Sequence, residues 1–365
     1  MKYIAIAGRQ PEISAAEIGA VFGDAKKING KVIEFESEVA PDINKLGGSL
    51  KIGQKISGPI IPYLMGLPEG KITLGVSDCS EKSSQKNATA EALKMKKVLM
   101  RHGRSVRVVN GKDAVLSTAT SLYNGMSGKN ERKVELIKVN NAWYKVVGVQ
   151  DINAYTKRDQ ARPARDAKVG MLPPKLAQIL INLCGPLSKE AVVLDPFCGT
   201  GVVLQEAMLM GYKAYGTDIS ERMIDYSNKN LAYYGFTGYM LEVGDVTKCQ
   251  WRQPIDAVAC EGYLGKPFSE VPSEMEVKTQ KSECGVIFLG FLKNLAKQIR
   301  SGTPVTVAMP AWLRSEAQYE RLFSAKMIDE IENMGYNVGN ESRVGMLYHR
   351  DGQVVARDII ILRKK

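Results

Sequence analysis

The chain has 365 residues, too many for one ordinary domain, so we expect two or three. Its 44% hydrophobic residues suffice for a core, but no apolar run reaches the roughly 18 residues of a membrane-spanning helix. The six cysteines form no Cys-x-x-Cys pair and there are two histidines, so we expect reduced thiols and no metal. The short apolar run at residues 3–7 predicts a buried strand rather than a signal peptide, and hence a cytoplasmic protein.

The formal net charge of +11 is unevenly distributed along the chain. Residues 1–165 contain 27 Lys and Arg against 16 Asp and Glu, whereas residues 166–365 contain 23 of each kind. The excess positive charge therefore belongs to the N-terminal part, as expected of a region that binds a polyanion such as nucleic acid. A basic surface that keeps the protein soluble and has no partner is the alternative.

The first 70 residues predict an α+β subdomain. Strands are expected at residues 3–7, 32–35 and 49–52. A helix begins at Pro11, and Ser14 with Glu17 forms a candidate capping box for it. Prolines and glycines between residues 59 and 70 then interrupt regular structure.

Residues 71–150 predict a second α+β unit. Its expected elements are strands at 72–76 and 105–109, helices at 88–102 and 115–124, and a hairpin of 134–139 with 143–149. The helix at 88–102 has an apolar side and carries lysines and arginines elsewhere. Among these we expect Lys97 and Arg101 to contact the polyanion.

A basic connector covers residues 151–170. Its arginines Arg158, Arg162 and Arg165 are the best candidates for phosphate contacts, and a solvated linker face is the alternative. Residues 171–177 open a helix, with prolines in its first turn, where a missing N–H is harmless.

Residues 171–365 alternate between strand and helix patterns. The expected elements are strands at 192–195, 213–218, 238–243, 257–260 and 304–309, and helices at 202–210, 221–235, 283–301 and 317–334. Connections of this length imply a parallel sheet. A hairpin of residues 343–348 and 354–362 around Asp351-Gly352 ends the chain, so we predict a mostly parallel seven-stranded α/β sheet that ends in an antiparallel pair.

The most informative segment is residues 194–201, Leu-Asp-Pro-Phe-Cys-Gly-Thr-Gly, between a predicted strand and a predicted helix. Gly199 and Gly201 are explained if a side chain there would block the approach of a ligand to the backbone. This string resembles motif I of the S-adenosylmethionine-dependent methyltransferases that modify exocyclic amino groups of bases. The resemblance implies a Rossmann-like domain and cofactor contacts from Asp195, Phe197, Cys198, Gly199, Thr200 and Gly201.

Two further aspartates end predicted strands. Asp218 ends the second strand, about twenty residues after the glycine turn, where a carboxylate accepts the ribose hydroxyls of a nucleoside cofactor. Asp245 ends the third strand and resembles the residue that meets the adenine amino group, although a turn aspartate would have the same pattern. Ile219 and Val246 follow these aspartates and complete the expected cofactor site.

The expected catalytic motif is altered. Amino methyltransferases carry Asp/Asn-Pro-Pro-Tyr/Phe after the fourth strand, where an acceptor polarises the amine and an aromatic ring stacks on the base. Here the fourth strand ends in Glu261-Gly262-Tyr263-Leu264, without either proline. Either Glu261 is the acceptor and Tyr263 the stacking platform, or the site has lost the reaction.

The resemblance extends to the N-terminal half. The THUMP-containing tRNA guanosine-N2 methyltransferases that act at tRNA position ten are similar to this chain at residues 3–17, 47–52, 158–159, 162–165, 170–177, 348–350 and 355–359, and less sharply at 71–125. This implies a THUMP-like RNA-binding domain at 71–150 that grips tRNA, a methyltransferase domain at 171–365, and Met171 in the cofactor pocket. Some members of the family use a small activator subunit.

Two other functions stay open at this point. A DNA amino methyltransferase acting on adenine N6 or cytosine N4 shares motif I, but the sequence contains no helix-turn-helix signal for reading duplex DNA. An RNA-binding protein with an impaired methyltransferase domain would explain the altered motif at 261–264.

Overall fold

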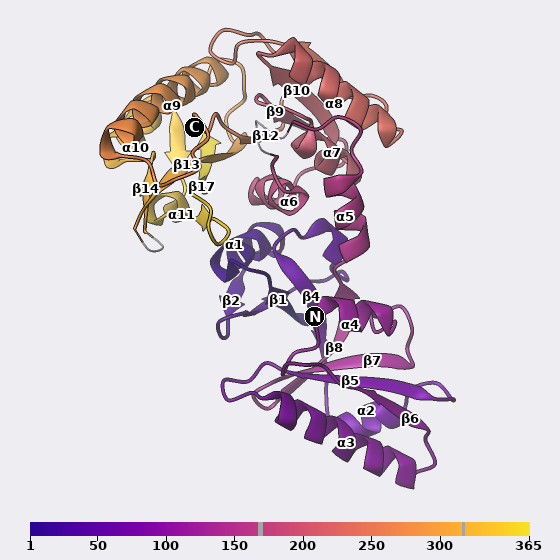
Figure 1. Cartoon of the computed structure of the whole chain (residues 1–365). Coiled ribbons are helices and arrows are strands. Elements are labelled where there is room, and N and C mark those ends of the chain that lie inside the picture. The colour runs from indigo at the N-terminus through magenta and orange to yellow at the C-terminus, as the bar shows by residue number, and fades with distance from the viewer. Residues whose placement is uncertain (167–170, 316–317) are drawn as a thin grey trace. The chain divides into compact units, whose positions relative to one another are not determined.

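The computed structural model of the chain describes residues 1–166, 171–315 and 318–365 (Figure 1). The chain forms two compact units, Met1–Tyr155 and Thr156–Lys365, each with its own sheet. Within the described ranges, no helix combines the length and the apolar composition that crossing a membrane requires.

The N-terminal unit is built on an eight-stranded sheet in the order β2-β3-β1-β4-β8-β7-β5-β6. Strand β8 pairs antiparallel with both β4 and β7, so strands from either side of residue 70 share one sheet, and the division at that residue stays a prediction. The elements are β1 Lys2–Ala7, α1 Pro11–Phe22, β2 Ala25–Lys27, β3 Val32–Glu36, a 3-10 turn Ile43–Lys45, β4 Ser49–Lys55, α2 Ile60–Met65, β5 Ile72–Asp78, α3 Gln85–Arg101, β6 Val106–Val109, α4 Thr118–Tyr123, β7 Lys133–Val139 and β8 Ala142–Val149.

Helix α1 begins without the predicted capping box. Its N-cap is Gln10, whose side chain makes no capping hydrogen bond, so Ser14 and Glu17 lie inside the helix. Ser14 Oγ donates to the carbonyl of Gly48 at 2.7 Å, and the buried Glu17 carboxylate accepts from the N–H groups of Gly47 and Gly48 at 2.8 Å each. The polar side chains therefore hold a glycine turn instead of the helix terminus.

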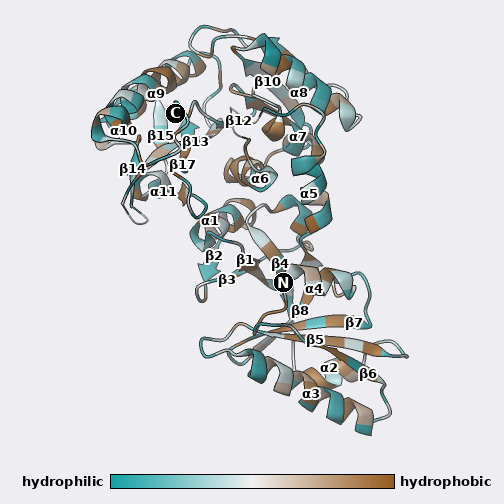
Figure 2. Ribbon diagram, viewed as in Figure 1, coloured by the Kyte–Doolittle hydropathy of each residue, from teal (hydrophilic) through white to brown (hydrophobic). Residues whose placement is uncertain are grey.

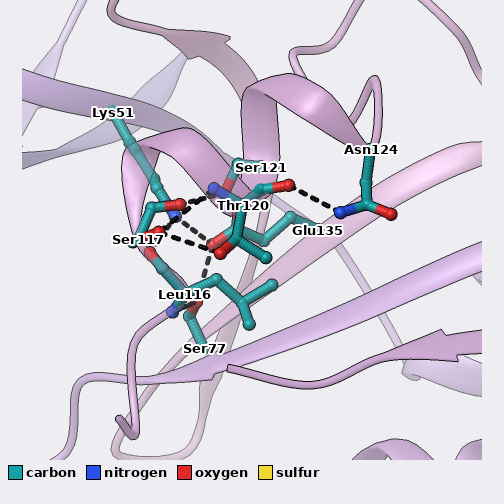
Figure 3. A network of polar contacts seen from close by, with 8 residues as sticks. All are labelled: Lys51, Ser77, Leu116, Ser117, Thr120, Ser121, Asn124 and Glu135. Atoms are coloured by element: carbon teal, nitrogen blue, oxygen red, sulfur yellow. Dashed lines mark hydrogen bonds and ion pairs between the residues drawn. The ribbon is translucent and has the colours of Figure 1, made fainter. Parts of the chain in front are cut away.

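A buried ion pair joins two strands of this unit (Figure 3). Lys51 Nζ on β4 lies 2.5 Å from Glu135 Oε1 on β7, and both side chains are at most 2% exposed. Ser77 and Ser121 donate their hydroxyls to the same carboxylate at 2.6 and 2.5 Å, and Lys51 also donates to the Leu116 carbonyl. Both glutamate oxygens are thus satisfied, as a buried charge requires.

The C-terminal unit contains a nine-stranded sheet where seven strands were predicted. Its main path is β11-β10-β9-β12-β13-β17-β15, and β14 and β16 pair with β13 and β17 beside this path. Strands β11 to β13 pair in parallel, and β17 is antiparallel to β13. The elements are α5 Ile152–Gln160, which begins before the boundary between the units, α6 Pro174–Leu183, β9 Val192–Asp195, α7 Val202–Leu209, β10 Lys213–Asp218, α8 Glu221–Tyr233, β11 Met240–Val243, β12 Ala257–Glu261, α9 Glu274–Leu295, β13 Pro304–Ser315, β14 Gln318–Arg321, α10 Ala325–Asn333, β15 Tyr336–Val338, α11 Asn340–Val344, β16 Leu347–Tyr348 and β17 Val355–Lys364.

Helices cover both faces of this sheet. Neighbours in a strand point to opposite faces, and Ala214 of β10 packs with Leu204 and Leu231 of α7 and α8, whereas Tyr215 joins the core that contains Phe291 of α9. Helix α6 packs against α7 and β12, and Lys175 is its one residue that is not buried. Its apolar residues are brown in Figure 2. The continuous apolar pattern of the strands follows from this two-sided burial.

Three predicted boundaries in this unit were wrong. Residues 318–321 form β14, which pairs with β13, whereas a helix was expected there; residue 317 lies outside the described residues. Helix α9 begins nine residues before its predicted start, at a capping box of Ser273 and Glu276. Only Leu347 and Tyr348 pair with β17 in the terminal hairpin, because residues 340–344 form α11.

Candidate active site

The predicted cofactor and catalytic residues meet at one edge of the C-terminal sheet. Strands β9, β10 and β12 are parallel neighbours and end at Asp195, Asp218 and Glu261. Strand β9 lies between β10 and β12, so the order of strands reverses beside Asp195. Such a switch point is where open α/β sheets bind ligands.

The turn after β9 contains two glycines, and each is needed for a different structural reason. Gly199 has φ +50°, and a Cβ placed on it would meet only the Phe197 carbonyl, at 3.9 Å, so its outer side is open to a ligand. Gly201 has φ +83°, and a Cβ there would lie 2.9 Å from Ser227 Oγ of α8. Gly201 therefore allows close packing of two helices, which differs from the predicted role in ligand approach.

Asp218 is held by the turn that it faces. Its Oδ2 accepts from the Gly199 N–H and its Oδ1 accepts from the Ser220 N–H, both at 2.9 Å. Each carboxylate oxygen has a further lone pair, so both stay able to accept a ribose hydroxyl. Ile219, the next residue, is 73% exposed.

Asp245 makes the contacts of a turn aspartate. Its Oδ1 accepts from the N–H and the hydroxyl of Thr247, and these bonds lower the pKa of the carboxyl. Val246 is buried, and its carbonyl accepts from Asn294 of α9. The contact of Asp245 with an adenine amino group stays a prediction.

Asp195 and its neighbours are mostly buried. The Asp195 carboxylate accepts from the Phe197 N–H at 3.1 Å, and burial raises its pKa well above the ordinary value, helped by the charges of Asp218 and Glu261. Burial also raises the pKa of the Cys198 thiol, which is therefore unreactive. The Phe197 ring packs edge-on against Phe291, with centroids 5.4 Å apart.

Glu261 is paired with an arginine that the sequence did not single out for this role. Its Oε1 accepts from Arg357 Nε at 2.8 Å, and the two side chains are 18% and 11% exposed. Tyr263 is 40% exposed, and partial burial raises its pKa. Glu261, the predicted acceptor, ends β12, and Tyr263, the predicted stacking residue, follows two residues later.

The connector arginines do not share one environment. Arg158 is buried and pairs with the fully buried Glu206 at 2.7 Å; burial nevertheless raises the pKa of Glu206 to about 7. Arg162 is also buried and donates to Thr200 Oγ1 at 3.3 Å. Both side chains are buried, which does not fit the predicted phosphate contacts, whereas Arg165 is exposed and its phosphate contact stays a prediction.

Other predicted residues fall into two groups. The Met171 sulfur accepts from Arg162 Nη2 at 3.5 Å, next to Thr200 of the glycine turn; residues 167–170 of the predicted connector lie outside the described residues. Lys97 and Arg101 lie on the exposed side of α3 and line a shallow depression of about 410 Å³. Their contact with RNA stays a prediction.

Sequence reasoning missed a second support of the glycine turn. Asn230 of α8 donates to the carbonyls of Thr200 and Ala164 at 2.8 and 2.9 Å, and its Oδ1 accepts from the Ala164 N–H. This side chain ties the connector to the turn. Polar residues within the buried stripe of α8, Ser227 and Asn230, were the signal that could have revealed it.

Comparisons with known families agree with this geometry. The family model described as a methyltransferase domain matches residues 187–333, from just before β9 to the end of α10. A second model, described as DNA methylase, matches residues 86–229. Together with the strand order, the first match confirms the Rossmann-like methyltransferase fold that motif I predicted for the C-terminal unit.

The chain is similar to proteins that are named as tRNA enzymes. A protein of Methanothermobacter thermautotrophicus named tRNA (guanine(10)-N2)-dimethyltransferase is 31% identical over 170 residues, which are 46% of this chain and about half (48%) of that protein. A protein of the same name from Pyrococcus abyssi is 27% identical over 288 residues, covering 75% of this chain and 77% of the relative. The crystal structure of TrmN from Thermus thermophilus aligns over 100% of both chains, with 16% identity and a TM-score of 0.48.

Proposed function

We propose that this protein is an S-adenosylmethionine-dependent methyltransferase that modifies the exocyclic N2 amino group of a guanosine in tRNA. The observation that carries the proposal is the Glu261 carboxylate at the end of β12, on the strand next to the one that leads into the glycine turn. The two relatives named as tRNA guanine-N2 enzymes support the choice of substrate.

The residues around the glycine turn fit the cofactor of this fold. The open side of Gly199 provides the room that a ligand needs against the backbone, and Asp218 provides a fixed acceptor for a ribose. S-adenosylmethionine, when bound, supplies an electrophilic methyl group on a sulfonium. The protein's contribution is to hold this group and the base in line and to exclude water between them.

Glu261 addresses the weakness of the nucleophile. The lone pair of a guanine N2 amine is delocalised into the ring, and a carboxylate that accepts a hydrogen bond from this amine makes the lone pair more available. S-adenosylmethionine would supply the methyl group, and the nitrogen that takes it would release one proton to Glu261 or to water. The exposed ring of Tyr263 is placed two residues further to stack on the base.

The N-terminal unit supplies the contact with RNA in this proposal. Most of the basic excess of the chain lies there, and Lys97 and Arg101 are on the exposed side of α3. Phosphate contacts of this kind position a nucleic acid without reading its sequence, so they suit a substrate recognised by shape.

DNA amino methylation is the second candidate. The match of the DNA methylase model over residues 86–229, which includes the glycine turn and β10, favours it. The same residues would then hold the cofactor, and Glu261 would face adenine N6 or cytosine N4 instead.

The test is transfer of tritiated methyl from S-adenosylmethionine to unmodified tRNA and to duplex DNA, with nucleoside analysis of the product. We expect label in tRNA as N2-methylguanosine. The matched control is a transcript with inosine in place of guanosine at position ten, which lacks only the N2 amino group and should stay unlabelled if this is the target. Label in DNA alone would establish the second candidate, and tRNA binding without transfer would favour the RNA-binding alternative.

A further inference from the structure

The pairing of Glu261 with Arg357 spans three strands of the sheet. Glu261 of β12 lies opposite Ala308 of β13, and Arg357 of β17 lies opposite Pro310, two residues further along the same strand. The guanidinium therefore reaches across β13, at the carboxyl edge of the sheet, to meet the carboxylate at 2.8 Å. The contact joins residues 96 positions apart in the sequence and holds the carboxylate of the first residue of the altered motif.

This contact uses one side of the carboxylate. Arg357 Nε donates to Oε1, and no other donor among residues 1–166, 171–315 and 318–365 lies within hydrogen-bonding distance of Oε2. A carboxylate oxygen has two lone pairs, so Oε2 is able to accept from an amine. The 18% exposure of the Glu261 side chain keeps it accessible from the edge of the sheet.

The altered motif explains why such support is needed. A Pro-Pro pair would restrict the backbone after the acceptor, and this chain has Gly262 and Tyr263 there instead. Glutamate also has one more rotatable bond than aspartate, so an unsupported carboxylate would occupy several rotamers. A charge-assisted bond from a partly buried arginine selects one of them.

We propose that Arg357 is a positioning residue that fixes the Glu261 carboxylate through Oε1 so that Oε2 accepts the hydrogen of the substrate amine. Arg357 does not touch the substrate in this arrangement. The inference rests on the proposed function for its catalytic consequence, but the arginine–glutamate pair can be tested without turnover.

The kinetic test compares R357M and R357K with R363M, a control on the same strand at the opposite end. Arg363 donates to the Gly302 carbonyl and has no contact with Glu261. We expect R357M to lower kcat roughly 10- to 100-fold, as misplacement of a reacting group does, with the Kd for S-adenosylmethionine changed less than twofold. We expect kcat of R357K to be intermediate and kcat of R363M to be unchanged. Loss of cofactor binding in parallel with kcat, or an equal loss of kcat in R363M, would overturn the positioning role.

The second test reads the pair directly. Proteins with ¹³C-labelled glutamate carboxyls are compared by NMR at one pH, and the Glu261 signal is assigned by its absence in E261Q. We expect the chemical shift of this signal to change in R357M, which lacks the contact, and to be the same in R363M as in the wild type. An unchanged signal in R357M overturns the pair even if tRNA methylation is found, whereas a changed signal in a protein without methyl transfer supports the pair and refutes the proposed function alone.

Discussion

Two acid–base pairs in this molecule look alike in composition and differ in construction. The pair of Lys51 and Glu135 in the N-terminal unit is almost fully buried. Serine hydroxyls donate to both oxygens of the Glu135 carboxylate in addition to the lysine. The pair of Arg357 and Glu261 in the C-terminal unit lies at the edge of its sheet, with one carboxylate oxygen engaged. Both carboxylate oxygens accept hydrogen bonds in the first pair, whereas one oxygen of Glu261 does so in the second.

The difference separates a structural role from a functional one. A buried charge must be satisfied completely, since every missing hydrogen bond costs free energy of folding. A catalytic acceptor must instead keep a lone pair for the substrate and give up part of its stabilisation. We therefore expect mutations in the first pair to change the free energy of unfolding and mutations in the second to change turnover.

The largest effect is expected for Lys51→Met. The substitution leaves the Glu135 carboxylate buried without its cation, which should lower the free energy of unfolding of the N-terminal unit by roughly 3–5 kcal/mol. Hydrogen exchange of peptides from β4 and β7 in the full chain measures this loss locally. The double variant K51M/E135M removes both charges and should regain part of it; a double variant no more stable than K51M would show that the pair is not the cause.

The matching change in the second pair is Glu261→Gln. We expect methyl transfer to tRNA to fall about 100-fold because the carboxylate charge is lost. The free energy of unfolding should fall less than in K51M, because the Glu261 side chain is 18% exposed and that of Glu135 is fully buried. Single-turnover kinetics and thermal unfolding of the same preparation give both values. Unchanged turnover would remove Glu261 from the mechanism, and the pair of Arg357 and Glu261 would then have no functional role.

The third pair, Arg158 with Glu206, should behave like the first because it is buried. Burial raises the pKa of Glu206 from 4.5 to about 7, so the folded protein holds this proton more tightly than the unfolded chain. The resulting stabilisation is complete below about pH 4.5 and is lost as the pH rises through about 7. We expect the unfolding midpoint of the C-terminal unit to fall over this window in the wild type and to be flatter in E206Q. The same slope in both proteins would contradict the assignment.

The smallest effect is expected at Arg165, which is exposed. If it contacts a phosphate, Arg165→Ala should reduce the slope of log affinity for tRNA against log salt by about 1 and leave stability unchanged. Fluorescence anisotropy over a range of salt concentrations measures the slope. Arg158→Met is the contrast, because it should lower stability without altering the slope. An unaltered slope in R165A would leave the connector without a phosphate contact.

The sequence predicted much of this fold because its signals are local. Motif I at 194–201 and the strands around it depend on glycine, apolar runs and a following helix, and the parallel sheet follows from the spacing of the elements. The β14 segment was misread as helix because its pairing with β13 is a tertiary contact that a helical pattern does not reveal.

The candidate site was predictable only where its contacts are short in sequence. Asp195 and Asp218 could be placed because each ends a strand, but the partner of Glu261 comes from a strand 96 residues later. The connector arginines show the opposite error, since a basic composition does not distinguish a buried arginine from an exposed one. The pairing of Arg158 with Glu206 depends on packing of α5 against α7, which no local pattern encodes.

The order of strands in the N-terminal sheet also sets when this unit can fold during synthesis. Strand β4 ends at Lys55, but β8, which pairs with it on the side away from β1, ends only at Val149. At roughly 5–20 residues per second a ribosome needs several seconds to make the intervening chain. During that interval β4 is an open edge with a lysine whose partner does not yet exist, so the nascent chain passes through a period of exposure to pairing with other strands.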